Sequence, residues 1–183
     1  MAKVLVPLAN GCEELEAVTI IDLLRRAQVE VVVAGLQQGS VKASRGTVLV
    51  PDTTLDQVKD VQFDMIVLPG GLPGADHLDK DPTLAAILEA MNQRQAHIGA
   101  ICAAPKVLAN AGYLNNKKAT AYPGAINQQD YPETEFLTET VVIDGNIITS
   151  KGPGTAMVFT LKLIEILCGK SKKQEIEAQL QLA

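Results

Sequence analysis

Short apolar runs alternate with amphipathic stretches along the first 110 residues of the chain. The apolar runs predict buried strands at residues 4–8, 30–36, 65–68 and 97–101. Helical periodicity between and after them predicts helices over residues 13–27, 82–95 and 103–111. This alternation favours an α/β fold, a mostly parallel sheet with helices on both faces. Ligands of such sheets bind beyond the carboxyl ends of the strands.

One acidic residue interrupts the apolar face of the first predicted helix. At about 100° per residue, Ala17, Ile20 and Leu24 share one arc of the helix, and Glu16 falls inside it. A carboxylate turned toward a core is costly unless it is paired or protonated. Glu16 is therefore either a functional carboxyl group or a charge on the helix surface. Glu13 shares the arc but lies in the first turn, where we expect it to cap the helix.

The second half of the chain has a less regular pattern. Asp144-Gly145-Asn146 lies between two apolar runs and predicts a hairpin. Short extended pieces are expected over residues 41–51, a helical turn near 55–58, a strand at 118–122, an exposed loop at 123–136, and helices over 156–167 and 170–180. No repeat or linker interrupts the chain, so we expect a single domain over residues 1–183.

The composition of the chain limits which binding partners and which cellular compartment we expect. The chain is 47% hydrophobic and 20% charged, as in a globular domain, and its net charge of -5 argues against binding to nucleic acid or to an anionic membrane. No apolar run reaches the roughly 20 residues of a membrane span. Cys12, Cys102 and Cys168 have no metal-like spacing, and the N-terminus does not read as a signal peptide. We therefore expect a cytoplasmic protein with no metal, no cofactor and no disulfide.

Cys102 stands where the fourth predicted strand ends and a helix begins. Its small neighbours Ala103 and Ala104 leave room for a sharp turn and a ligand, and Pro105 suits a first helical turn. Such an elbow lifts a nucleophile above the sheet, and a helix N-terminus directed at the sulfur favours the thiolate. The alternative is a cysteine buried in the core. Cys12 is an edge-loop thiol without a clear use, and we expect a structural role for Cys168.

The usual activator of a reactive cysteine is a histidine, and the chain has two. His97 begins the strand that ends at Cys102, so the two lie about 16 Å apart at about 3.3 Å per residue. His77 follows a glycine-rich loop, where we expect it to be solvated. Glu16 remains as the acidic neighbour, acting in its protonated form.

The loop at residues 69–74 contains three glycines but no nucleotide-binding pattern. The N–H groups of Gly71 and Ala103 would both flank the Cys102 sulfur. We therefore favour an oxyanion hole over a phosphate-binding loop at this position.

Five motifs resemble, in order and spacing, those of the ThiJ/PfpI superfamily. They lie at residues 9–16, 43–45, 67–71, 100–105 and 149–155, and the resemblance extends over about residues 3–170. Within the superfamily they are most similar to the branch that contains the Parkinsonism-associated deglycase and its bacterial ThiJ-like relatives. The resemblance implies a flavodoxin-like three-layer sandwich that forms a homodimer.

The resemblance also implies roles for individual residues. Cys102 corresponds to an oxidation-sensitive nucleophile, Glu16 to a protonated glutamate hydrogen-bonded to it, and Gly71 and Ala103 to the oxyanion-hole amides. Arg45 corresponds to an arginine that approaches the site across the dimer interface. The remaining positions that would bind substrate or support the site are Gly70, Tyr122, Gly152 and Pro153.

At two positions the sequence departs from its relatives. Tyr122 replaces a histidine of the animal deglycase, and a phenol with a pKa near 10 is a poor base at neutral pH. Ala103 stands where the protease and chaperone branches carry a histidine after the cysteine, so we do not expect peptidase activity.

Two functions are consistent with these residues. The first is a cofactor-independent glyoxalase or deglycase, in which Cys102 attacks a methylglyoxal-type α-oxoaldehyde or an early glycation adduct. The second is an oxidative-stress sensor or chaperone in which Cys102 is oxidised to a sulfinate held by Glu16, without significant catalysis. The sequence leaves open the physiological substrate, which function dominates and the oxidation state of Cys102.

Overall fold

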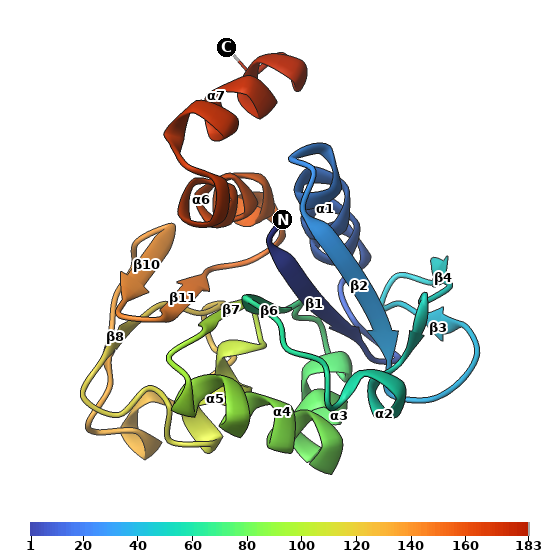
Figure 1. The fold of residues 1–183 in the computed structure, drawn as a ribbon. Coiled ribbons are helices and arrows are strands. Elements are labelled where there is room, and N and C mark those ends of the chain that lie inside the picture. The colour runs from blue at the N-terminus through green and yellow to red at the C-terminus, as the bar shows by residue number, and fades with distance from the viewer. Residues whose placement is uncertain (183) are drawn as a thin grey trace.

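A seven-stranded sheet forms the centre of the computed structural model, which describes residues 1–182 (Figure 1). In order across the sheet, the strands are β10 (Val141–Asp144), β11 (Ile147–Ser150), β7 (His97–Ile101), β6 (Met65–Leu68), β1 (Lys3–Leu8), β2 (Glu30–Gly35) and β5 (Thr53–Thr54). Neighbouring strands are parallel, except that β10 and β11 form the expected antiparallel hairpin at one edge. Two short ladders lie outside this sheet: β3 (Val41–Lys42) with β4 (Val48–Leu49), and β8 (Lys118–Ala119) with β9 (Glu135–Phe136).

Helices cover both faces of the sheet and complete three layers (Figure 1). One face carries α1 (Glu14–Arg26) and α6 (Ala156–Cys168), with α7 (Lys170–Gln179) packed on α6. The opposite face carries α2 (Leu55–Val58), α3 (Gly74–Lys80), α4 (Pro82–Gln93) and α5 (Pro105–Asn110). This arrangement confirms the flavodoxin-like α/β sandwich. No helix within residues 1–182 has the length and apolar character needed to cross a membrane.

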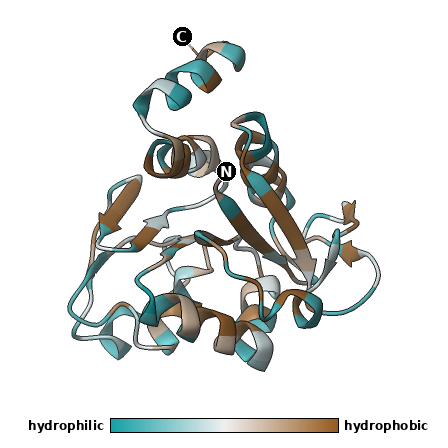
Figure 2. Ribbon diagram, viewed as in Figure 1, coloured by the Kyte–Doolittle hydropathy of each residue, from teal (hydrophilic) through white to brown (hydrophobic). Residues whose placement is uncertain are grey.

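Each inner strand contributes to two hydrophobic cores because successive side chains point to opposite faces of a sheet. In β1, Val4 and Val6 pack in the core beneath α1 and α6, whereas Leu5 packs in the core beneath α4 and α5. All three are fully buried, and truncating such a leucine to alanine costs about 2–5 kcal/mol. Figure 2 shows that hydrophobic residues are concentrated in the central strands and hydrophilic ones along α7.

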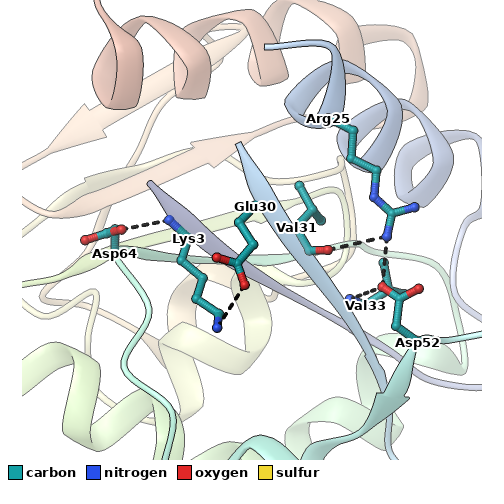
Figure 3. Close-up of polar contacts among 7 residues, drawn as sticks. All are labelled: Lys3, Arg25, Glu30, Val31, Val33, Asp52 and Asp64. Carbon is teal, nitrogen blue, oxygen red and sulfur yellow. Dashed lines mark hydrogen bonds and ion pairs between the residues drawn. The ribbon is translucent and has the colours of Figure 1, made fainter. Parts of the chain in front are cut away.

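Polar contacts fix the ends of the β1–β2 pair to neighbouring segments (Figure 3). Asp52 accepts a hydrogen bond from the N–H of Val33 at 3.0 Å and forms an ion pair with Arg25 of α1 at 2.8 Å. Near the N-terminus, the N–H of Lys3 donates to Asp64 at 2.7 Å. The Arg25 and Asp52 side chains are each about half exposed, so the pair stabilises the fold by no more than about 1 kcal/mol. The contacts of Asp52 mainly fix the position of the backbone directly before β5.

The structure differs from the sequence prediction in three places. The sequence pattern does not predict helix α3. Most of its residues are polar, and Ala75 and Leu78 are its only buried apolar side chains. The helix after Cys102 begins at Pro105 rather than at residue 103, because the intervening residues form a turn. The strand expected at residues 118–122 is limited to the two residues of β8, and the loop expected at 123–136 contains a 3₁₀ turn, Gln128–Asp130, and β9.

Candidate active site

Cys102 occupies the sharp turn after β7, as the sequence predicts. Its φ of +64° lies in the left-handed region, which residues with a side chain rarely adopt. Two neighbouring segments hold this conformation: the Cys102 N–H donates to the Ser150 carbonyl at 3.0 Å, and the Cys102 carbonyl accepts from the Tyr122 N–H at 2.9 Å. The residue is 8% exposed, so the elbow places it at the surface of the core rather than deep inside it.

The loop after β6 lies directly against this elbow. A Cβ atom added at Gly70 would come within 2.6 Å of the Cys102 Cβ, and Gly71 has a φ of +90° that favours glycine. These two glycines let the loop backbone approach the sulfur. The N–H groups of Gly71 and Ala103 donate toward the Cys102 sulfur and favour its ionised form, as expected for a pair of oxyanion-hole donors.

Glu16 projects from α1 to the same point and is fully buried. Its Oε2 atom accepts a hydrogen bond from the Gly70 N–H at 2.8 Å. No group with ordinary hydrogen-bond geometry meets Oε1 within residues 1–182, although the Cys102 thiol lies close enough to lower the pKa of the carboxyl group. Burial outweighs both contacts and raises the pKa of Glu16 to about 7. The carboxyl group can therefore gain or lose a proton near neutral pH.

The prediction of an ionised thiol is not supported by the geometry of the single chain. Burial, with the charge of Glu16 as the second cause, raises the pKa of Cys102 to about 12, against the opposing N–H groups of Gly71 and Ala103. Helix α5 has only six residues and starts three residues after the cysteine, so its dipole does not offset these effects. Of the two groups, the carboxyl group loses its proton first, and the thiol then faces a carboxylate that can accept its proton.

Three further predicted residues surround the elbow. Tyr122 is about half exposed, and its ring lies against Gly152, where an added Cβ would come within 3.0 Å of the Tyr122 Cδ2 atom. Gly152 donates its N–H to the Thr155 Oγ1 at 3.1 Å, and Pro153 begins the 3₁₀ turn Pro153–Thr155. The structure therefore brings all three residues to the side of the site that faces β11.

Arg45 lies in the turn between β3 and β4, and only its backbone is held. Its N–H donates to both carboxylate oxygens of Glu14 at 3.1 Å, and the Ser44 hydroxyl donates to the carboxylates of Glu13 and Glu14. The Arg45 side chain is exposed, and within residues 1–182 no ion pair or hydrogen bond joins it to Cys102 or Glu16. A single subunit thus holds the turn near α1 without bringing this guanidinium group to the thiol.

The histidines lie away from the thiol. His77 is on α3 rather than in a loop, and its Nδ1 atom donates to the Asn10 carbonyl at 2.8 Å. It lines a separate cavity of about 380 Å³ beside the ends of β1 and β2. His97 lies at the opposite end of β7 from Cys102.

The other two cysteines differ in environment. Cys12 is buried, and burial raises its pKa to about 11, while Cys168 is exposed at the end of α6. Within residues 1–182, no cluster of three or more His, Cys, Asp or Glu side chains is arranged to hold a metal ion.

Sequence reasoning missed two residues that shape the site. Ser150 supplies the carbonyl that holds the Cys102 N–H, and its hydroxyl lies 2.7 Å from the hydroxyl of Thr155. The end of a strand is the signal that could have identified Ser150, because strand ends meet at the functional edge of a parallel sheet.

The fold and the cysteine–glutamate site define a class of α/β proteins, and the chain belongs to the DJ-1/PfpI family, whose sequence profile matches residues 2–166. This confirms the resemblance seen in the motifs. The chain is 45% identical to Protein dj-1beta of Drosophila melanogaster, over 98% of this chain and 96% of that protein. It is 36% identical to a Caenorhabditis elegans protein named Glutathione-independent glyoxalase DJR-1.2, over 100% of this chain and 96% of that protein. Among solved structures, oxidized Toxoplasma gondii DJ-1 superposes with a TM-score of 0.93 and 40% identity over the full length of both chains.

Proposed function

We propose that the protein is a cofactor-independent glyoxalase that converts α-oxoaldehydes such as methylglyoxal into 2-hydroxy acids. The observation that carries this proposal is the fully buried Glu16 carboxyl group beside Cys102, with a pKa raised to about 7. A group that titrates near neutral pH suits the repeated proton transfers of such a reaction. The name of the C. elegans relative supports the same activity.

The first step forms a covalent bond between sulfur and substrate. The Cys102 sulfur attacks the aldehyde carbon of methylglyoxal while the thiol proton passes to the Glu16 carboxylate. The aldehyde oxygen becomes an oxyanion facing the N–H groups of Gly71 and Ala103, which stabilise the developing charge. Glu16 then returns the proton to this oxygen, which gives a hemithioacetal and restores the Glu16 carboxylate.

The second step moves a proton between two neighbouring carbons. The Glu16 carboxylate removes the hydrogen from the former aldehyde carbon, giving an enediolate. It then returns this proton to the adjacent carbon while the hydroxyl proton of the first carbon passes to the former ketone oxygen. The product is a thioester of lactate on Cys102. Water then adds to the thioester carbonyl, releases lactate and restores the thiol. The net reaction consumes one methylglyoxal and one water and needs no redox partner.

The same chemistry extends to early glycation adducts, in which an α-oxoaldehyde has already added to an amine or a thiol. Displacement of the amine or thiol by the Cys102 sulfur, with the thiol proton leaving on the displaced group, would give the same hemithioacetal, which then undergoes the same proton transfer and hydrolysis. Whether such adducts are attacked directly is decided by comparing the rate of adduct loss with the rate at which the adduct dissociates without enzyme.

The experiment that tests the function measures lactate formed from methylglyoxal by the wild type, by Cys102→Ser and by Cys168→Ser. We expect Cys102→Ser to abolish turnover and Cys168→Ser, at an exposed helix end, to leave it unchanged. Full turnover by Cys102→Ser would refute the proposal.

A homodimer would complete this site. Apolar side chains of Leu15 and Val18 on α1 and of Val48 and Val50 at the β3–β4 hairpin are exposed together. Val18 and Val50 line a groove between α1 and the hairpin that is also lined by Leu49. A patch of this kind favours association, and a partner packed on it would bring its own copy of the Arg45 turn close to α1.

A redox-sensing role is the second candidate, and the buried Oε1 atom of Glu16 favours it. This oxygen has no partner with ordinary hydrogen-bond geometry within residues 1–182, and once protonated it could donate to an oxygen of a Cys102 sulfinate. Mild peroxide treatment followed by peptide mass spectrometry distinguishes the two functions. Selective addition of two oxygens at Cys102, together with negligible methylglyoxal turnover, would favour the sensor.

A further inference from the structure

Tyr122 is fixed to the reactive cysteine more firmly than its exposure suggests. Its N–H donates to the Cys102 carbonyl at 2.9 Å, and its own carbonyl accepts from the Ala125 N–H at 3.0 Å. Pro123 follows it and restricts the Tyr122 backbone to extended conformations. The backbone that carries the Tyr122 side chain is therefore tied to the elbow at Cys102.

The Tyr122 ring packs against a glycine. The Tyr122 ring lies against Gly152, where an added Cβ would be 3.0 Å from the ring Cδ2 atom. Gly152 has a φ of 166°, which any residue adopts, so the space for the ring is the reason for a glycine here. Tyr122 remains 51% exposed, so part of the ring faces solvent beside the site.

We infer that the Tyr122 ring forms one wall of the substrate site and determines specificity, favouring α-oxoaldehydes that carry a planar aromatic group on the ketone carbon. This inference rests on the proposed glyoxalase function and names its preferred substrate class. The inference places the substituent of the ketone carbon on the side of the elbow where the Tyr122 N–H donates to the Cys102 carbonyl at 2.9 Å. An aromatic ring held there offers an offset-stacked or edge-to-face partner to an aryl group.

The inference assigns the effect to the ring and not to the hydroxyl group. No hydrogen bond of the Tyr122 hydroxyl is formed within residues 1–182, whereas the hydroxyl of Tyr131 donates to Asn110. Tyr122→Phe should therefore preserve the preference, and Tyr122→Leu, which keeps an apolar side chain without a ring, should lose it.

The test compares kcat/KM for phenylglyoxal with kcat/KM for methylglyoxal in the wild type and in the Phe, Leu and Ala variants of Tyr122. We expect Tyr122→Leu and Tyr122→Ala to lower the ratio of the two values by about two- to tenfold, the range that one aromatic pair supports. Tyr122→Phe should keep the wild-type ratio. An equal fall for both substrates would overturn the inference, because the ring would then only support the elbow. A loss in Tyr122→Phe as large as in Tyr122→Leu would also overturn it.

A matched pair of glycine variants tests the wall without changing the tyrosine. In Gly152→Ala the new methyl group meets the ring and must displace it, whereas an added Cβ at Gly154 has nothing within 4 Å. We expect the ratio to fall in Gly152→Ala and to stay unchanged in Gly154→Ala. Identical ratios in the two variants would contradict the inference.

A chemical probe separates this inference from the proposed function. Iodoacetamide and 2-iodo-N-phenylacetamide both alkylate a thiol, with loss of iodide and of the thiol proton, and neither requires turnover. Peptide mass spectrometry at Cys102 gives the two rates, and the aryl-to-alkyl ratio should fall in Tyr122→Leu. If neither glyoxal is converted but this alkylation ratio falls, the inference about Tyr122 is supported and the glyoxalase proposal fails. If glyoxals are converted but neither ratio changes, the wall is refuted and the glyoxalase proposal remains.

Discussion

The Glu16 carboxyl group accepts a hydrogen bond from the Gly70 N–H at 2.8 Å, which ties helix α1 to the loop after β6. Gly70 is followed by Gly71, whose own N–H points toward the Cys102 sulfur. One contact therefore orients both the carboxyl group and an oxyanion-hole donor. Glutamine at position 16 can still accept this hydrogen bond but cannot act as a base, so Glu16→Gln separates geometry from proton transfer.

We expect Glu16→Gln to remove the pH dependence of Cys102 reactivity near neutrality. In the wild type, alkylation of Cys102 by iodoacetamide should accelerate as pH rises through about 7, where Glu16 becomes a carboxylate that can take the thiol proton. The variant lacks this base, and its methylglyoxal kcat at neutral pH should fall by about 10²- to 10⁴-fold. A persistent rise near pH 7 in Glu16→Gln would assign the titrating group to another residue.

The same carboxyl group should make the stability of the fold depend on pH. Its pKa is raised from 4.5 to about 7 on folding, so between these values the folded chain binds more protons than the unfolded chain. The contribution of protonated Glu16 is then complete below about pH 4.5 and is lost as pH rises through about 7.

Urea unfolding of the wild type and of Glu16→Gln at a series of pH values measures this effect. Relative to the variant, the wild type should lose as much as about 3 kcal/mol of unfolding free energy between pH 5 and pH 8. A difference that grows in favour of the wild type as pH rises would show that the carboxylate, rather than the acid, is the form stabilised by the fold.

Gly70→Ala should damage both stability and activity. The added Cβ would lie 2.6 Å from the Cys102 Cβ and 2.7 Å from the Ile101 carbonyl oxygen, so a backbone segment must shift. We expect a loss of about 1–3 kcal/mol, visible as a lower Tm in calorimetry, and slower Cys102 alkylation. Gly154→Ala is the control because its Cβ enters open space. If the two variants had the same Tm and the same alkylation rate, Gly70 would not be needed for close approach.

Association through the α1 and β3–β4 patch predicts a mass in solution of twice the 19.5 kDa subunit. Val50 is 80% exposed, and a charge there should weaken an apolar interface. Sedimentation of Val50→Glu should therefore give a larger monomer fraction than sedimentation of the wild type. Val61→Glu, at an exposed valine before β6, serves as the control and should not change the mass. A monomeric wild type would refute the interface.

The layers of the fold could be predicted from the sequence because strands buried on both faces read as continuous apolar runs. Residues 65–68 are such a run, and the structure places β6 at Met65–Leu68. Glu16 was recognisable for a similar reason, since a helical period of 3.6 put it among side chains that prove to be buried. Helix α3 gave no comparable signal, because a seven-residue helix with polar residues at most positions has almost no apolar face.

The pKa of Cys102 could not be predicted from the sequence for a different physical reason. A helix start after a cysteine favours the thiolate, but the depth of burial and the position of the Glu16 charge depend on how α1, β6 and β7 pack together. The role that the resemblance implies for Arg45 stays a prediction, because a single chain specifies where its turn lies, whereas the position of a second copy would depend on the surfaces of both. The local pattern of apolar and polar residues thus predicts helices and strands well, but it predicts the pKa values of buried groups poorly.

The left-handed turn at Cys102 depends on strands that are distant in sequence. Its N–H is held by Ser150 in the last strand of the sheet, and the carboxyl group beside its sulfur comes from the helix after the first strand. Loss of the β10–β11 edge would remove the Ser150 carbonyl that holds the Cys102 N–H. The conformation of Cys102 therefore depends on the pairing of β7 with β11, and local opening of this edge of the sheet should change the reactivity of the thiol.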